Sequence, residues 1–345
     1  MLKEKLKDKK ILFFSVEFFN IEKEIINKLE EVGAKVDYFD ERPSNNIFIK
    51  GIIRLNRGFY KRKIKSYYNT IFQKIKNNHY DYLFVIKGEV IPIEFLDKFC
   101  KLKPDTKTIY YTYDSVENNK NSKIFLKYFK YKFTFDHHDA KNYELNLQPL
   151  FYFDSLRNLT SSKTPSYDLL FIGTAHTDRY IIANEVENFF KSLKLKTFTF
   201  FYLPSRLVYY FKIIFDSTFK SFDYSKLSFK SLSENDVINL YKKSKIILDI
   251  NHPLQKGLTM RTIEAIGAKK KLITTNSEIL KYSFYNENNI CVIKRKNIYI
   301  PEEFLAKPYI DIPEVIYNDY SLENWLKRIF SGNLNKSWIV KWKKF

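Results

Sequence analysis

The sequence predicts an α/β protein made of two Rossmann-like domains, and three observations lead to that prediction. Short apolar segments typical of buried strands alternate with longer segments of helical periodicity. The polar stretch 156–168, "LRNLTSSKTPSYD", interrupts this alternation, which then begins again. The chain has 345 residues, more than most single domains. We therefore expect domains at 1–155 and 166–310, and a helical tail at 311–345 that could pack back on the N-terminal domain.

The first half begins with a β-α-β unit. Ile11–Val16 is an apolar strand, Ile21–Val32 has helical spacing and ends at Gly33, and Lys35–Asp40 is the next strand. Alternation continues with strands at 82–86, 108–113 and 132–135, and with helices at about 57–77 and 93–101. Strands joined by crossover helices form an open parallel sheet.

The second half repeats this organisation. Strands are expected at 168–172, 196–202, 246–250, 272–274 and 290–294, and helices at 178–193, at 234–243 and within 251–276. Ligands of open α/β sheets bind outside the carboxyl ends of the strands, at helix N-termini. The architecture therefore predicts a cleft between the two domains, without specifying a reaction.

The charge balance narrows the classes of partner. Lys and Arg total 59 against 39 Asp and Glu, a formal net charge of +20, which attracts nucleic acids, anionic membranes or phosphorylated small molecules. The best candidate for a membrane span, 198–215, is interrupted by Pro204, Arg206 and Lys212 and is not expected to cross a bilayer. The N-terminus has no signal-peptide pattern, and the two cysteines form no disulfide or metal pattern. We expect a cytoplasmic protein, with room for peripheral contact on the inner face of the cytoplasmic membrane.

The stretch 251–276, "NHPLQKGLTMRTIEAIGAKKKLITTN", carries the most specific chemistry. Thr259 is a suitable N-cap, so a helix should begin near Met260. Arg261 and Glu264 are three residues apart and share a face. Free helix amides and the arginine suit a diphosphate, and the glutamate could accept two hydrogen bonds from a ribose. The spacing alone favours the alternative, an ordinary Arg261–Glu264 pair on a solvated helix face.

Several segments resemble one family. "GLTMRTIEAIGAKKKLITTN" resembles the C-terminal signature of bacterial GT-B glycosyltransferases of the "glycosyl transferases group 1" type, in particular a branch encoded with capsule and lipopolysaccharide biosynthesis genes. "IYYTYDS" at 109–115, "FTFDHHDAKNY" at 133–143 and "DLLFIGTAHTDRY" at 168–180 are similar to segments of that branch and occur in the same order. The resemblance implies two Rossmann-like domains facing each other across a cleft, and transfer of a sugar from a nucleotide-sugar donor held by the C-terminal domain.

The resemblance also assigns roles and shows two departures. Glu264 matches the glutamate that binds the donor ribose. Lys256 stands where the broader family has the first glutamate of an E-x7-E pair, and a lysine there could meet the donor phosphate. Lys269 stands where the family usually has glycine, so the helix could end differently.

A second group of donor contacts is expected in the turn Gly173–Thr177, where Asp178 could cap the following helix. The alternative is an ordinary tight turn with an exposed histidine. Together the expected donor residues are Asn251, His252, Lys256, Gly257, Thr259, Arg261, Glu264, Thr174, His176 and Arg179.

An inverting transferase needs a base that removes the proton of the acceptor hydroxyl. Asp114, at the end of an apolar strand, is the first choice, and Glu17, Glu89 and His137 are the alternatives. The pair of histidines in "FDHHD" lacks further ligands at metal-binding spacing, and no Asp-x-Asp occurs in a suitable loop. We therefore expect a metal-independent reaction that needs no cofactor beyond the nucleotide-sugar substrate.

The acceptor expected from the resemblance is a surface-polysaccharide glycan, which could be lipid-linked. A basic amphipathic segment at 54–75 suits an anionic membrane, although its apolar stripe could equally be core. A rival class is a nucleic-acid-binding protein, but no signature of a nucleic-acid-binding module occurs, so no nucleic acid is expected. A non-catalytic GT-B module is the other alternative.

Overall fold

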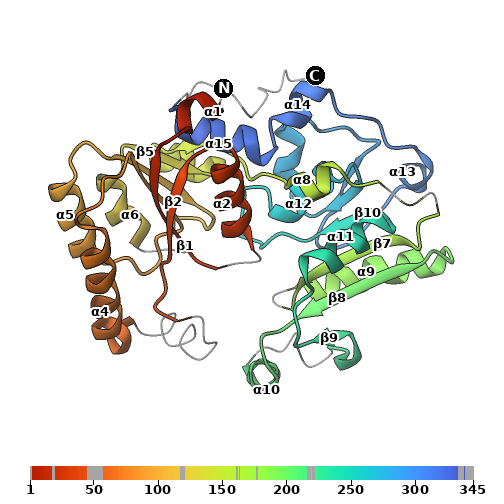
Figure 1. Ribbon diagram of the computed structural model, residues 1–345. Coiled ribbons are helices and arrows are strands. Elements are labelled where there is room, and N and C mark those ends of the chain that lie inside the picture. The colour runs from red at the N-terminus through yellow and green to blue at the C-terminus, as the bar shows by residue number, and fades with distance from the viewer. Residues whose placement is uncertain are drawn as a thin grey trace. The chain divides into compact units, whose positions relative to one another are not determined.

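The computed structural model describes residues 2–17, 20–44, 57–116, 121–160, 162, 164–175, 178–215, 219, 222–332 and 338 (Figure 1). The chain divides into two compact units. The first unit comprises Met1–Pro149 with Leu322–Lys336, and the second comprises Leu150–Ser321 with Ser337–Phe345. The first unit therefore ends at Pro149, before the predicted domain end at 155. Tyr152 already belongs to the second unit, where its N–H donates to Tyr320 O at 2.8 Å.

The first unit is built on a six-stranded sheet in the order β2-β1-β3-β4-β5-β6, in which all paired strands are parallel. Its strands are β1 (Lys10–Ser15), β2 (Lys35–Asp40), β3 (Tyr82–Ile86), β4 (Lys107–Thr112), β5 (Tyr131–Thr134) and β6 (Asn146–Leu147). Its helices are α1 (Leu2–Leu6), α2 (Ile21–Glu31), α4 (Arg57–Ile75), α5 (Ile93–Leu102), α6 (Asn121–Phe125), α7 (His137–Asn142) and α15 (Leu322–Ser331), with a 3-10 turn η1 (Leu126–Tyr128). The five strands predicted here are confirmed; β6 is too short to give a sequence signal.

The second unit repeats the plan with the strand order β12-β11-β10-β7-β8-β9, again parallel throughout. Its strands are β7 (Tyr167–Thr174), β8 (Thr197–Tyr202), β9 (Leu227–Ser228), β10 (Ser244–Asp249), β11 (Lys271–Thr274) and β12 (Ile290–Val292). Its helices are α8 (Asp154–Arg157), α9 (Arg179–Ser192), α10 (Arg206–Phe215), α11 (Glu234–Lys242), α12 (Met260–Gly267), α13 (Glu302–Ala306) and α14 (Glu314–Asn318), with 3-10 turns η3 (Tyr224–Lys226) and η4 (Ser277–Lys281). The predicted two-sheet α/β fold class is thus confirmed.

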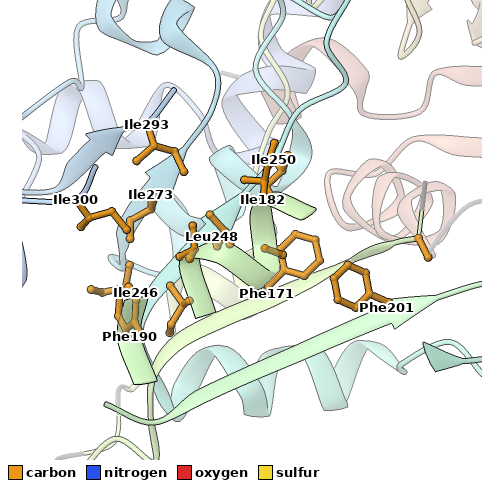
Figure 2. Packing of buried hydrophobic residues seen from close by; sticks show 14 of the residues in the cluster. Phe171, Ile182, Phe190, Phe201, Ile246, Leu248, Ile250, Ile273, Ile293 and Ile300 are labelled. Carbon is orange, nitrogen blue, oxygen red and sulfur yellow. The ribbon is translucent and has the colours of Figure 1, made fainter. Parts of the chain in front are cut away.

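The core of the second unit explains why these segments form a parallel sheet (Figure 2). Phe171 of β7 and Phe201 of β8 lie with ring centroids 5.0 Å apart, and Ile182 and Phe190 of α9 belong to the same buried cluster. Leu248 of β10 is also fully buried there. Burying each such side chain contributes roughly 1.5–3 kcal/mol relative to exposure, which holds α9 on the sheet.

Helix α4 contains the apolar stripe for which the sequence allowed two interpretations, packing in the core or contact with a membrane. Ile64, Tyr68, Ile71 and Ile75 are all buried, and they pack in the cluster that includes Phe14 of β1. The stripe is therefore core, and membrane contact through this face of α4, one of the two sequence hypotheses, is wrong. Residues 54–56 lie outside the described part of the chain.

The predicted C-terminal tail is divided between the two units. Helix α14 belongs to the second unit, whereas α15 belongs to the first, where it contacts α1 and α2. Trp325 of α15 is fully buried, with its ring 4.9 Å from that of Tyr111 and 6.2 Å from that of Phe84. None of the helices described has the length and hydrophobicity of a membrane span.

Helix α12 ends in a Schellman motif that has lysine where glycine is usual. The N–H of Lys269 donates to Ile266 O at 3.0 Å, and the N–H of Lys270 donates to Ala265 O at 2.9 Å. These bonds require a left-handed backbone at Lys269, whose φ is 51°. An L side chain in that region is strained, and Lys269 takes the left-handed position that glycine usually occupies at a helix end.

Replacing Lys269 by glycine is expected to raise the free energy of unfolding by roughly 0.5 kcal/mol. Glycine relieves about 1 kcal/mol of left-handed strain, and the loss of the exposed ion pair with Asp311 (2.8 Å) offsets part of it. Urea denaturation measures the difference, with Asp311→Asn as the control that removes the ion pair alone. A Lys269→Gly protein less stable than Asp311→Asn would contradict the assignment of strain.

Candidate functional site

The carboxyl ends of three neighbouring strands in the second unit gather the predicted donor residues. β7, β10 and β11 are adjacent and parallel, and they end at Thr174, Asp249 and Thr274. Helices α9 and α12 are the next helices after β7 and β10, so their positive ends lie at the same edge. This is the edge at which open α/β sheets bind ligands.

Buried Asp249 positions the start of α12. Thr262 Oγ1 donates to Asp249 Oδ2 at 2.7 Å, and Thr259 Oγ1 accepts from the N–H of Thr262 at 3.1 Å. Thr259 is thus the N-cap and α12 begins at Met260, as the sequence predicts. The remaining amides of the first turn have no partner within the helix and are available to an anion.

Arg261 and Glu264 lie side by side on α12, joined by a residue that sequence reasoning missed. Arg261 Nη1 donates to Glu264 Oε2 at 2.6 Å and to the hydroxyl of Tyr241 at 3.0 Å. The Tyr241 hydroxyl in turn donates to Glu264 Oε2 at 3.1 Å. The two charged side chains are only 22% and 15% exposed, so this is not the solvated surface pair of the alternative interpretation.

Glu264 and Arg261 each have polar atoms that make no hydrogen bond to a described residue. Both hydrogen bonds of Glu264 go to Oε2, and within the described residues Oε1 accepts none. Only Nη1 of the Arg261 guanidinium is engaged by a described residue. Burial lowers the pKa of Arg261, but the neighbouring Glu264 carboxylate and Tyr241 outweigh it and raise the pKa above its usual value, so the guanidinium stays charged.

Arg179, at the first position of α9, is the second predicted cation. Its Nε donates to Ile250 O at 2.8 Å, and its Nη1 donates to Thr174 Oγ1 at 2.9 Å. Burial lowers the pKa of Arg179; Asp249 counteracts this, while the charges of Arg295 and Arg261 lower the pKa further. Arg179 and Arg295 donate to the consecutive carbonyls of Ile250 and Asn251, and Arg261 is in the first turn of α12, so three guanidinium groups lie at the carboxyl edge of the sheet.

Arg295 was not predicted, because it follows the short strand β12 and carries no motif. Its Nη1 donates to both carboxylate oxygens of Asp178, at 2.8 and 2.7 Å, and its Nη2 donates to Asn251 Oδ1 at 2.9 Å. Asp178 occupies the N-cap position of α9, but the expectation that its side chain caps the helix is wrong. The carboxylate makes no capping hydrogen bond because it pairs with Arg295. A basic residue just after a strand of a parallel sheet was the available signal.

The other donor candidates shape the loop 251–259. Asn251 is buried and donates from Nδ2 to Gln255 O at 2.9 Å, and His252 Nδ1 accepts from the N–H of Leu254 at 3.3 Å. Gly257 is buried and its carbonyl accepts from Asn276 Nδ2 at 3.2 Å, whereas Lys256 is exposed. His176 lies outside the described residues.

The base candidates lie in the first unit and differ in exposure. Asp114 follows β4, its side chain is 45% exposed, and its Oδ2 lies 3.1 Å from Lys87 Nζ. Glu89 is buried and pairs with Arg42. Glu17 is exposed, and its N–H donates to Asp40 Oδ2 at 3.3 Å.

His137, the fourth alternative, begins α7. Its neighbour His138 donates its N–H to Asp136 Oδ1 at 2.8 Å, so Asp136 caps this helix. The rings of His137 and His138 are 4.5 Å apart between centroids. Of the four candidates, Asp114 combines an accessible carboxylate with a neighbouring cation that orients it.

Glu41 is a buried acid that sequence reasoning missed. It is 0% exposed; its Oε1 accepts from the N–H of Glu89 at 2.8 Å, and its buried Oε2 has no hydrogen-bond partner among the described residues. Burial raises the pKa of Glu41 to about 8, although the hydrogen bond from Glu89 opposes this.

This acid predicts a pH-dependent stability. Between the ordinary pKa of 4.5 and about 8, the folded protein keeps the Glu41 proton that the unfolded chain releases. The contribution to stability is therefore complete below pH 4.5 and is lost as the pH rises to about 8. Urea denaturation should show a decline across this range in the wild type and a flatter profile in Glu41→Gln. Parallel profiles would contradict the buried neutral acid.

Comparison with known proteins places this geometry in context. No family model matches the chain, and no curated protein matches it. Solved structures do match: a glycosyltransferase from Rickettsia africae superimposes with a TM-score of 0.57 and 15% identity, covering 96% of this chain and 100% of that one. HepE from Anabaena, in complex with UDP and glucose, superimposes with a TM-score of 0.57 and 9% identity, covering 95% of this chain and 100% of that one. The chain has the GT-B fold. Sucrose-phosphate synthase from Thermosynechococcus elongatus is also similar, with a TM-score of 0.55, 8% identity and 95% of each chain covered.

Proposed function

We propose that this GT-B protein is a glycosyltransferase that moves a sugar from a nucleotide-sugar donor to a glycan of a surface polysaccharide. The observation that carries the proposal is that Arg179, Arg261 and Glu264 all lie at the carboxyl edge of the second sheet. The similarity to HepE, whose structure contains UDP and glucose, supports a nucleotide as the ligand of this fold. The capsule and lipopolysaccharide assignment rests on the sequence motifs alone.

In this proposal the second unit binds the donor. Free amides at the start of α12 and the unused guanidinium nitrogens of Arg261 bind the diphosphate, with Arg179 supplying further positive charge. Oε1 of Glu264 accepts hydrogen bonds from the ribose hydroxyls. Helix amides and guanidinium groups already in place stabilise the negative charge of the departing nucleoside diphosphate, so the proposed reaction is metal-independent.

The first unit is proposed to bind the acceptor, with Asp114 as the base. The acceptor oxygen forms a bond to the anomeric carbon as the bond from that carbon to the diphosphate breaks. The nucleoside diphosphate leaves with the electron pair, and the hydroxyl proton passes to the Asp114 carboxylate, which Lys87 orients at 3.1 Å.

The proposal is tested by titrating the protein with UDP, GDP, CMP and the corresponding sugar donors, and with a single-stranded oligonucleotide. We expect one nucleotide to raise the melting temperature, and Arg261→Met to abolish the shift. Glu185→Gln, an exposed change elsewhere in the second unit, is the control. Stabilisation by the oligonucleotide alone, lost at moderate salt, would favour a nucleic-acid-binding protein instead. Nucleotide binding without turnover of any donor would indicate a non-catalytic GT-B module.

A lipid-linked acceptor is the finer proposal, and helix α10 supports it. Leu207, Tyr210, Phe211, Ile214 and Phe215 are 56% to 80% exposed. The helix is held by its other side, where Tyr209 is buried with its ring 5.0 Å from that of Tyr224. Exposed aromatic and aliphatic side chains next to Arg206 and Lys212, in a chain of net charge +20, suit an anionic bilayer surface.

Removing two of these aromatic side chains should weaken membrane binding. We expect wild type to sediment with vesicles rich in phosphatidylglycerol, and Phe211→Ser with Phe215→Ser to lose affinity at least about tenfold, because each buried ring contributes more than about 1 kcal/mol. The control, Tyr299→Ser with Val315→Ser, removes two hydrophobic side chains away from α10 that are 74% and 78% exposed. Equal sedimentation of both double variants would contradict the role of α10.

A further inference from the structure

The guanidinium of Arg295 lies between the start of α9 and the loop that leads to α12. β12 ends at Val292, in register with Thr274 of β11, so the residues after it reach the carboxyl edge of the second sheet. Ile293 packs in the same buried cluster as Ile250, the residue before the loop, as Figure 2 shows. Arg295 is thereby placed at the edge that the proposed function assigns to the donor.

The N–H groups of Arg295 are divided between two partners. Nη2 donates to the carbonyl oxygen and to the side-chain oxygen of Asn251. Nη1 donates to both carboxylate oxygens of Asp178, at 2.8 and 2.7 Å. Asn251 is itself fixed, since Thr275 Oγ1 donates to its Oδ1 at 2.7 Å and its Nδ2 donates to Gln255 O at 2.9 Å. Asn251 thus holds the guanidinium in place independently of Asp178.

The contact between Arg295 and Asp178 is the looser of the two. Both carboxylate oxygens share one nitrogen, whereas a strong bidentate pair uses two parallel N–H···O bonds from two nitrogens. The side chains of Arg295 and Asp178 are 24% and 33% exposed, and an ion pair open to water is weak. Among the described residues the carboxylate has no other hydrogen-bond donor, since it does not cap α9. Asp178 can therefore turn to water while Arg295 stays on Asn251.

The ion pair of α12 is held more firmly. Glu264 is less exposed than Asp178, and its Oε2 accepts both from Arg261 at 2.6 Å and from the Tyr241 hydroxyl at 3.1 Å. Arg261 in turn donates to the same hydroxyl, so three side chains close a ring of hydrogen bonds. Of these two guanidinium–carboxylate pairs, the pair of Asp178 is the easier one to open.

We infer that Arg295 is a phosphate-binding residue of the donor site, and that Asp178 occupies its Nη1 until the diphosphate displaces the carboxylate. This inference rests on the proposed function, which brings a diphosphate to this edge. Arg179 bonds to Thr174 and to the carbonyl of Ile250, and Arg295 bonds to the residues that follow these on the two strand ends. A diphosphate replaces one weakly held carboxylate by an anion with more charge and more acceptor oxygens, to which helix amides also donate.

Asp178→Asn tests the inference, because this variant should bind a diphosphate more tightly than wild type. The amide keeps the shape of the carboxylate but not its charge, so it competes less for Arg295 and does not repel the ligand. Calorimetric titration with inorganic pyrophosphate should give a Kd at least about fivefold lower in Asp178→Asn and at least about tenfold higher in Arg295→Gln. A gain in affinity cannot come from a damaged fold.

Two comparisons exclude a general charge effect. In the Arg295→Gln background, adding Asp178→Asn should change the Kd less than about twofold, because Asp178 acts through Arg295. Glu185→Gln removes an exposed negative charge from α9 itself and should bind pyrophosphate like wild type. Unmeasurable, unchanged or weaker binding by Asp178→Asn would overturn the inference, and so would the same gain in the absence of Arg295.

Titration of the same proteins with UDP and GDP separates this inference from the proposed function. If Asp178→Asn binds pyrophosphate more tightly but no protein binds a nucleotide, the proposed function fails and the role of Arg295 stands. If wild type binds a nucleoside diphosphate and Asp178→Asn does not bind it more tightly, the inference fails and the proposed function stands.

Discussion

Replacing Glu264 by alanine is expected to weaken binding of the nucleoside diphosphate about 100-fold. Oε2 of the carboxylate accepts from Arg261 and Tyr241, whereas no residue in the described part of the chain donates to Oε1. Two charge-assisted hydrogen bonds from ribose hydroxyls at about 1.5 kcal/mol each would amount to about 3 kcal/mol, or roughly two orders of magnitude in Kd. Isothermal titration calorimetry of wild type and variant with the nucleotide that binds best measures this loss.

A folding check and the control variant Glu185→Gln are needed to interpret the affinity of Glu264→Ala. Glu264→Ala leaves the Arg261 guanidinium, 22% exposed, without its carboxylate, so the variant should also be less stable. Circular dichroism must therefore show that it is folded at the temperature of the titration. Glu185→Gln removes one exposed negative charge from the same unit and should bind like wild type. If folded Glu264→Ala binds the nucleotide with unchanged affinity, Glu264 does not bind the ribose.

Gly267→Ala is expected to destabilise the second unit by about 3 kcal/mol. Gly267 ends α12, and a Cβ added there would lie 2.5 Å from both Cβ and Cγ of Tyr152. Tyr152 cannot easily move, because it is fully buried and its N–H donates to Tyr320 O at 2.8 Å. The Gly267 carbonyl is also fixed, since it accepts from the Tyr317 hydroxyl at 2.6 Å. Overpacking of this kind costs roughly 1–3 kcal/mol or more.

Whether Gly267→Ala lowers or raises the free energy of unfolding decides between overpacking and helix propensity as the dominant effect. Helix propensity alone favours alanine over glycine by about 1 kcal/mol, so an unconstrained position would gain stability. Equilibrium urea denaturation, followed by circular dichroism, distinguishes the two. A variant as stable as wild type or more stable would show that α12 does not pack against Tyr152 as described.

Much of the fold could be predicted because parallel strands are buried on both faces and appear as short apolar runs. β3 is buried along its whole length and has the predicted bounds. The edge strand β2 is only partly buried, and its predicted bounds follow from Gly33, which ends the preceding helix. The start of α12 was predictable because its cap, Thr259, is a local signal. β6 and β9, each of two residues, have no periodicity to detect.

The candidate site was predictable where its residues share a helix or belong to a recognisable motif, as Arg179 does. Arg261 and Glu264 are three residues apart, so their proximity follows from helix geometry. Tyr241 and Arg295 reach the site from other elements, and their pairing with Glu264 and Asp178 depends on the folded sheet. Local capping preference favoured Asp178 as a cap, but the long-range ion pair prevails. Glu41 is buried by tertiary packing, which its sequence neighbours do not reveal.

The central claim is that Glu264 recognises the ribose of a nucleotide, and a double comparison tests it most directly. Binding of the preferred nucleoside diphosphate and of its 2′,3′-dideoxy analogue is measured by calorimetry on wild type and on Glu264→Ala. We predict that wild type discriminates against the analogue by roughly 100-fold and that the variant binds both equally weakly. Equal discrimination in both proteins would contradict the claim, because the ribose hydroxyls would then be bound elsewhere.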